Sequence, residues 1–127
     1  MRVLLVEPKQ VPKVVDIGED LKAMQEVVGG IIQVVYPFKN PDVAVVCHDE
    51  GKVIGMPLNR GLRGEDGKVY DIISGTFFVC GAPVDGEDFV SLTEEQVATY
   101  SQWFATPEQF VFIDGQALAL PLVEVTV

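Results

Sequence analysis

Turn-forming residues divide this sequence into short β-rich segments, and the short connections between them restrict its possible folds more than any other feature. The first segments, at residues 2–7, 13–17, 31–36 and 43–47, are rich in valine and isoleucine. Most of the connections are shorter than the roughly twelve residues that a crossover between parallel strands requires. The sequence therefore predicts an α+β fold with a mainly antiparallel sheet.

Two stretches have the apolar period of a helix. A stripe that begins at Leu21 predicts a helix over about residues 19–28, and a pair of glycines ends it. Thr93 and Gln96 have the spacing of a capping box, which predicts a second helix over about residues 94–104. We expect two helices in the domain.

Two further turn signals lie in the later β-rich segments. Ser74-Gly75 lies in the middle of the apolar stretch 69–80, which is therefore either two strands or one strand with a bulge. Asp114-Gly115 lies between residues 110–113 and 117–127 and is a strong cue for a two-residue hairpin loop. We expect a C-terminal β-hairpin.

Length and hydropathy predict one domain without a membrane span. A chain of 127 residues is long enough to bury a core, so we expect a single domain over residues 1–127. No segment approaches the roughly 20 apolar residues of a membrane-spanning helix, and the apolar start is too short for a secretory signal. Cys47 and Cys80 lie in apolar runs, where reduced thiols are commoner than disulfides. We therefore expect a cytoplasmic protein.

The charge is strongly acidic and unevenly distributed. The formal net charge is -10, and the last basic residue is Lys68, although acidic residues continue to the end of the chain. Such a distribution disfavours direct nucleic-acid binding, because phosphates are repelled, and it allows a basic protein partner. Acids that imitate DNA phosphates, as in an anti-defence protein, are an alternative. The simplest interpretation is a surface that keeps the protein in solution.

Asn59, Arg60 and Arg63 form the most site-like group in the sequence. If Asn59 caps a single helical turn, the two guanidinium groups can converge on one carboxylate or phosphate. Tyr70 and Asp71 are either partners of these arginines or strand residues. These five residues are candidates for binding a ligand or partner; alternatively, the arginines pair with the protein's own acids.

A second candidate is an acidic patch. It comprises Asp85, Glu87, Asp88, Glu94 and Glu95. Such a patch can bind a basic protein or supply a general acid/base pair. Carboxylates at the start of a helix also stabilise its macrodipole, which is the structural interpretation of the same residues.

No residue set predicts catalysis, a metal or a cofactor. His48, the single histidine, follows Cys47 directly, and strand alternation places neighbouring side chains on opposite faces. One histidine and two distant cysteines also lack the spacing of metal ligands. We expect no catalytic residue, no metal and no cofactor.

Several short motifs occur together in the order found in one family. They are Val34-Val35-Tyr36-Pro37-Phe38, Asp49-Glu50-Gly51-Lys52, Pro57-Leu58-Asn59-Arg60, Tyr70-Asp71-Ile72-Ile73 and Gly75-Thr76-Phe77-Phe78. With this set, the chain resembles the domain of unknown function 3846 family from its first strand to the helix start at residues 92–96. The resemblance implies a context, since such proteins are encoded in bacteria, phages and conjugative elements. It implies no catalytic or ligand residues.

Two classes of function remain open. The first is a non-enzymatic accessory protein of a phage or mobile element, which binds a macromolecular partner through the loop of Arg60 and Arg63 or through the acidic second half. The second is a small-molecule binder or enzyme with a pocket beside Asn59, Arg60 and Asp71. A homo-oligomer is compatible with both classes.

Overall fold

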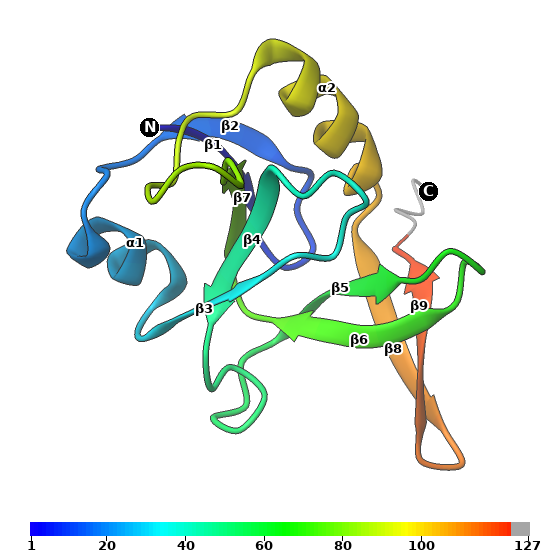
Figure 1. Cartoon of the computed structure of the whole chain (residues 1–127). Coiled ribbons are helices and arrows are strands. Elements are labelled where there is room, and N and C mark those ends of the chain that lie inside the picture. The colour runs from blue at the N-terminus through cyan, green and yellow to red at the C-terminus, as the bar shows by residue number, and fades with distance from the viewer. Residues whose placement is uncertain (123–127) are drawn as a thin grey trace, which may run out of the picture.

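A five-stranded antiparallel sheet forms the centre of the computed structural model, which describes residues 1–122 (Figure 1). Its strand order is β2-β1-β7-β4-β3. The strands are β1 (Arg2–Val6), β2 (Lys13–Asp16), β3 (Ile32–Val35), β4 (Val43–His48) and β7 (Phe77–Gly81). All four strand pairs are antiparallel, so the predicted α+β fold with an antiparallel sheet is confirmed.

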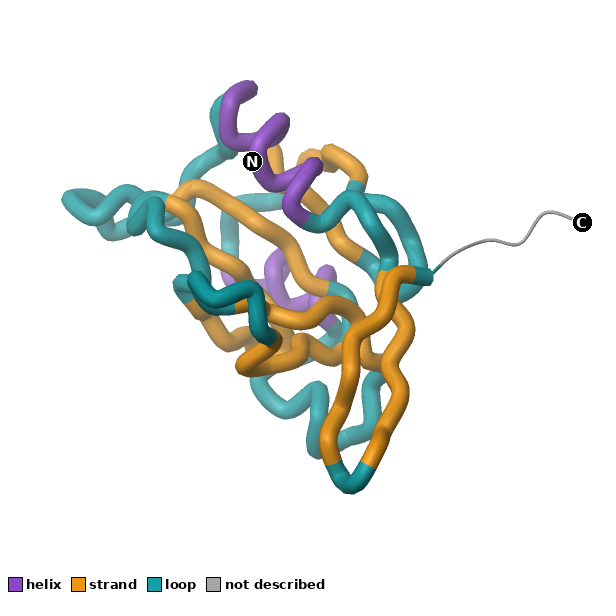
Figure 2. The backbone as a smooth tube through the Cα atoms, turned by 90° about the vertical axis from the view of Figure 1, so that its right-hand side faces the viewer, coloured by secondary structure: helices purple, strands orange, loops and turns teal. Residues whose placement is uncertain are grey.

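Two hairpins accompany the sheet. The first joins β5 (Leu58–Arg63) to β6 (Val69–Ser74), and the second joins β8 (Glu108–Ile113) to β9 (Gln116–Pro121). The tip of the β8–β9 hairpin projects from the rest of the molecule, whereas its base packs against β5 (Figures 1 and 2). It confirms the predicted C-terminal hairpin, although the last five residues of the segment predicted at 117–127 lie outside the described part of the chain.

The core lies on both faces of the central sheet. On one face, Val45 and Phe77 pack with Leu62 of the β5–β6 hairpin and with Phe104 at the end of helix α2 (Glu94–Trp103). On the other face, the alternate residues of the strands pack against helix α1 (Leu21–Val28). Strands β4 and β7 are buried on both faces, which explains their nearly continuous apolar sequences. The β5–β6 hairpin and α2 are therefore on the same side of the sheet.

Local sequence signals set the ends of the helices. Asp20 caps α1, because its side chain accepts a hydrogen bond from the amide of Ala23, and Gly29 ends the helix with a φ of 89°. Thr93 and Gln96 form the predicted capping box of α2. Both predicted helices are confirmed, with α1 beginning two residues later and α2 ending one residue earlier than expected.

Gly75 separates β6 from β7, so the apolar stretch 69–80 contains two strands. Gly75 has a φ of 81°, a left-handed conformation that a glycine adopts without strain. A Cβ atom at this position would also lie 2.7 Å from the sulfur of Met56.

In residues 1–122, no helix is both long enough and apolar enough to span a membrane.

Candidate functional site

The segment with Asn59, Arg60 and Arg63 is a β-strand, so the predicted helical turn is wrong. Residues Leu58–Arg63 pair with β6 as strand β5, with register shifts between Leu58 and Arg60 and between Leu62 and Arg63. The two guanidinium groups therefore do not converge on one ligand. Arg60 is buried, whereas the Arg63 side chain is 40% exposed.

Asn59 is buried and fully engaged inside the protein. Its Nδ2 donates to the carbonyl oxygens of Val6, at 2.9 Å, and Gly75, at 2.8 Å. Its Oδ1 accepts a hydrogen bond of 2.8 Å from Arg60 Nη1. Asn59 thus links β5 to the central sheet through hydrogen bonds, and its side-chain amide is not exposed to solvent.

Arg60 is also buried, and all of its partners are oxygens of neutral groups. Its Nε and Nη2 donate to the carbonyl of Phe104, at 3.3 and 3.2 Å, and Nη2 also donates to the carbonyl of Gln10. Burial lowers the pKa of the Arg60 guanidinium, and the charge of Glu108 acts in the opposite direction. Because Phe104 caps the C-terminus of α2, the cation of Arg60 lies at the favourable end of the helix dipole. Arg60 is a structural link between α2 and the loop after β1.

Arg63 pairs with Glu108, a residue that belongs to no motif of the sequence. Arg63 Nη2 lies 2.7 Å from Glu108 Oε2, and Nη1 lies 3.3 Å from Oε1. The same Oε1 accepts a hydrogen bond from the amide of Gly61. The Glu108 carboxylate raises the pKa of the Arg63 guanidinium through these hydrogen bonds. No local pattern marks Glu108, because its partners are 45 and 47 residues away in the chain.

Arg63 and Tyr70 border a groove of about 590 Å³ between the β5–β6 hairpin, the loop after β3 and α2. Phe38 and Tyr100 are buried at its base, with ring centroids 4.3 Å apart. Trp103 packs edge-on against Phe38 at 5.3 Å and remains 52% exposed, and Tyr70 is 61% exposed. We call this feature the aromatic groove.

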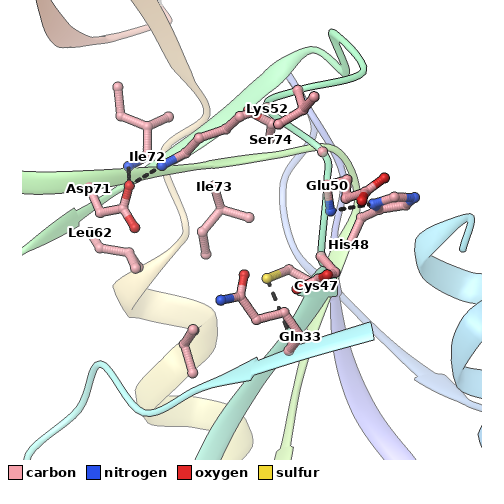
Figure 3. Close-up of a pocket in the computed structure, with 14 residues that line it drawn as sticks. Gln33, Cys47, His48, Glu50, Lys52, Leu62, Asp71, Ile72, Ile73 and Ser74 are labelled. Carbon is pink, nitrogen blue, oxygen red and sulfur yellow. Dashed lines mark hydrogen bonds and ion pairs between the residues drawn. The ribbon is translucent and has the colours of Figure 1, made fainter. Parts of the chain in front are cut away.

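Asp71 lies at a second cavity of about 270 Å³, between the end of β4 and β6 (Figure 3). The ammonium group of Lys52 pairs with its carboxylate. Val35, Leu62 and Ile73 are among the apolar lining residues. We call this cavity the Lys52 pocket.

Most of the chain matches a known protein family. The family described as "Domain of unknown function (DUF3846)" matches residues 1–105. The chain belongs to the DUF3846 family. No curated protein and no solved structure matches the chain. Both cavities are lined by residues within the DUF3846 match, whereas Glu108 and the β8–β9 hairpin lie beyond it.

The thiol and imidazole of the DUF3846 domain are engaged separately. Cys47 is buried, and its thiol lies 3.7 Å from the carbonyl of Gln33. Burial, and secondarily the charge of Asp71, raises the pKa of the Cys47 thiol. The Nδ1 of His48 accepts a hydrogen bond from the amide of Glu50 at 2.9 Å. The geometry therefore does not activate Cys47 through His48.

The predicted acidic patch consists of two groups of exposed residues. Asp85, Glu87 and Asp88 lie in the loop between β7 and α2, and Glu94 and Glu95 form the first turn of α2. None of the five forms an ion pair within residues 1–122. The same part of the chain contains no cluster of three or more side chains suited to hold a metal ion.

Proposed function

We propose that this DUF3846 protein is a non-enzymatic binding protein that captures a protein partner in its aromatic groove. The proposal rests on one observation: Trp103, Tyr70 and Arg63 all border the aromatic groove. Tryptophan, tyrosine and arginine are the residue types that dominate the energetics of protein interfaces. An accessory role in a phage or mobile element fits this activity and the context that the family resemblance implies.

The base of the groove is rigid, which lowers the entropy cost of binding. Phe38 and Tyr100 are buried and packed against each other, so they do not have to be ordered when a partner arrives. Glu108 holds the guanidinium of Arg63 end-on. This geometry leaves the Nε–H of Arg63 and its outward Nη hydrogens for an acceptor on the partner.

The chemistry of the groove favours a segment with an apolar or proline side chain next to an acidic residue. Aromatic walls accept such side chains, as in domains that bind extended proline-rich peptides. Lys39 also borders the groove, and its pair with Glu65 is easily exchanged, because both side chains are more than 80% exposed. A nucleic acid is a poorer candidate, since the protein carries a net charge of -10.

Trp103 provides a direct test, because it is the only tryptophan in the chain. A photo-crosslinking residue in place of Thr99, an exposed residue that borders the groove, would capture a partner from the native host. The captured protein is then purified and added in increasing amounts to the natural DUF3846 protein while the fluorescence of Trp103 is recorded. We expect saturable binding that changes the Trp103 emission.

Two tyrosines supply a matched pair of variants for this titration. Tyr70 is 61% exposed and borders the groove, whereas Tyr36 is 58% exposed and does not border it. Tyr70→Ala is expected to lower the affinity for the partner by roughly tenfold or more, as for an interface hot spot. Tyr36→Ala is expected to leave this affinity unchanged. Equal effects of the two substitutions would refute the proposed use of the groove.

Salt separates this proposal from the alternative of an acidic DNA mimic. Capture through aromatic contacts and one charged contact at Arg63 is expected to weaken only modestly between low and moderate ionic strength, whereas capture through many carboxylates weakens steeply. The comparison uses the same titration at about 50 and 300 mM NaCl, a range over which screening of exposed charges changes strongly. A steep loss of affinity would favour the charge mimic.

A further inference from the structure

Strand β9 has a free edge. Within residues 1–122, it pairs with β8 and with no other strand. The base of the hairpin is tied to β5, where Glu108 accepts a hydrogen bond from the amide of Gly61, and its tip projects from the molecule (Figures 1 and 2). A free edge presents unpaired backbone N–H and C=O groups, and a two-stranded hairpin without further strands is only marginally stable in water. The edge of β9 is therefore suited to receive another strand.

The turn of the hairpin determines which backbone groups point to this edge. Asp114 and Gly115 have φ angles of 52° and 79°, as in a two-residue type I′ turn. The residues that flank such a turn, Ile113 and Gln116, form a hydrogen-bonded pair of the ladder. This pair sets the alternation along the rest of β8 and β9.

Ala117 and Ala119 direct their backbone groups to the free edge. Hydrogen-bonded and non-hydrogen-bonded pairs alternate along an antiparallel ladder, so both alanines are at non-hydrogen-bonded positions. The amide of Leu122 donates a hydrogen bond of 2.7 Å to the carbonyl of Pro107 at the base of the hairpin, which follows the same alternation. The N–H and C=O groups of Ala117 and Ala119 therefore point away from β8.

The hairpin also lacks the features that normally prevent strands from pairing at an edge. One of its faces is apolar and 38–56% exposed, and the apolar residues of this face are Val111, Ile113, Leu118 and Leu120. Among residues 109–121, Asp114 in the turn is the only charged residue, and the only proline is the last residue of β9. Protected edges carry charges or prolines within the strand.

We propose that a second copy of this chain pairs with the free edge of β9, so that two hairpins form one four-stranded antiparallel sheet. Ala117 and Ala119 pair with Ala119 and Ala117 of the second copy, and Leu118 lies opposite its own copy on the two-fold axis. A shift of this register in one direction places Pro121, which has no N–H, opposite Ala117, and a shift in the other direction places Ala119 opposite the turn. The edge is thus complementary to itself in one register.

Charge distinguishes a second copy from a basic strand of another protein. Each copy has a net charge of -10, so two copies repel each other and can approach most closely at an uncharged edge. Salt screens this repulsion, and the dimer should therefore become tighter as salt is added. A basic strand is attracted by the same charge, and its binding should weaken.

Sedimentation equilibrium of the full chain tests the dimer. We expect an average mass that rises from 13.9 kDa toward twice this value between about 10 and 500 μM protein, with a dissociation constant of roughly 100 μM for so small an interface. The rise should be larger at about 300 than at about 50 mM NaCl. A monomer at every concentration and both salt levels would leave the edge to another protein or to water and would overturn the proposal.

Leu118→Lys and Val111→Lys separate edge pairing from packing of the two apolar faces. Both residues are on the same face, are 43% and 38% exposed, and give the same change of net charge. Leu118→Lys places two like charges opposite each other on the axis and should weaken the dimer by roughly tenfold or more, whereas Val111, one strand further away, should have little effect. Equal losses would show that the hairpins pack face to face.

Leu118→Cys and Leu120→Cys test the register. Both residues are on the same face of β9, with exposures of 43% and 41%, but only Leu118 lies on the proposed axis, where a disulfide can form between the copies. With oxidised glutathione as the oxidant, Leu118→Cys should form a covalent dimer at least about tenfold faster than Leu120→Cys, because the natural cysteines are buried. Equal rates would contradict the register.

Trp103→Ala should leave the dimer unchanged, since Trp103 borders the aromatic groove and lies outside the hairpin. Leu118→Lys should in turn leave the affinity of the groove for its partner unchanged. The failure of one proposed site is therefore distinguishable from the failure of the other. Loss of the dimer in Trp103→Ala would contradict an interface formed by β9.

Discussion

Glu108 holds the exposed arginine of this protein in place. Its carboxylate is 7% exposed and accepts hydrogen bonds from Arg63 and from the amide of Gly61. Glu108→Ala leaves the buried amide of Gly61 without an acceptor, removes the ion pair of Arg63, and is expected to lower the free energy of unfolding by about 2 kcal/mol. Urea denaturation measures the change.

The ion pair of Lys39 and Glu65 is the control for this prediction. Its side chains are 86% and 83% exposed, so Glu65→Ala is expected to change the free energy of unfolding by less than about 0.5 kcal/mol. Equal losses in Glu65→Ala and Glu108→Ala would show that the burial of Glu108 contributes nothing to the strength of its pair.

The role of Glu108 also shows what single residues reveal from sequence. The sequence suggested that the arginines pair with acids of the same chain, and this is correct for Arg63. The partner was not predictable, because the packing of β8 against β5 brings Glu108 to Arg63 from 45 residues away. Asn59 and Arg60 have the side chains of a binding site, but a polar residue in a buried hydrogen-bond network has the same sequence signature as an exposed one.

The two cysteines are expected to react slowly in the folded protein. Burial raises the pKa of Cys80 from 9.0 to about 12, and burial also raises the pKa of Cys47. Because the thiolate is the reactive form, a thiol reagent at about pH 8 should label both residues only slowly until urea is added. Rapid labelling of the native protein contradicts the buried positions of the thiols.

The same shift makes stability depend on alkaline pH. The folded pKa of Cys80 is above its ordinary value, so its contribution is complete below pH 9.0 and is lost as the pH rises toward about 12. Cys80→Ala is expected to reduce the fall of the unfolding free energy between about pH 9 and 11. Unfolding in urea at a series of pH values measures the slope, and an unchanged slope would exclude Cys80 as a contributor.

Among the elements, the β8–β9 hairpin lies beyond the residues that match the DUF3846 family. The family match ends at residue 105, and the central sheet, both helices and the β5–β6 hairpin are formed by residues before Thr106. Glu108 connects the hairpin to β5, whereas Phe112 and Ile113 near its tip are 67% and 56% exposed. We therefore expect residues 1–107 to fold without the hairpin.

Shortening the chain to residues 1–107 tests this expectation. The short chain is expected to keep its helices and sheet and to unfold cooperatively, with a loss of about 2–3 kcal/mol from the contacts of Glu108 and the covered surface of β5. Circular dichroism and urea denaturation provide the measurement. A short chain without a cooperative transition would show that the hairpin is part of the folding unit.

Elements were predictable where their signals are local. The capping box at Thr93 and the Asp114-Gly115 turn define structure within a few residues, and both predictions are confirmed. No sequence pattern predicts strand β5, because polar residues and a glycine interrupt its apolar residues. The strand order was also not predictable, since β1 pairs with β7, and Leu4 lies opposite Val79. Such pairing depends on how the two faces of the sheet are covered, not on neighbouring residues.

At the scale of the molecule, the fold mixes charges that the sequence keeps apart. The basic residues all precede Val69, but Lys52 pairs with Asp71 and Arg63 pairs with Glu108. The second half of the chain is therefore not a separate acidic face. What remains uncompensated is the total charge of -10, part of it in the loop between β7 and α2.

This excess charge is expected to make stability depend on salt. Like charges in a compact molecule repel one another, and salt screens the repulsion, so the melting temperature should rise between about 20 and 500 mM NaCl. Asp85, Glu87 and Asp88 are exposed and form no ion pair within residues 1–122, which makes them suitable for a matched variant. Replacing the three with Asn, Gln and Asn changes the net charge from -10 to -7, since -10 plus 3 is -7.

The triple variant should melt at a higher temperature than the natural protein in low salt and should show a smaller rise with added salt. If the same three residues also contact a partner as DNA mimics, the variant loses partner affinity in the titration of the aromatic groove. If the partner is held by Trp103, Tyr70 and Arg63, the affinity is unchanged while the melting temperature rises. An identical salt dependence in both proteins would show that repulsion involving these loop carboxylates does not limit the stability of the fold.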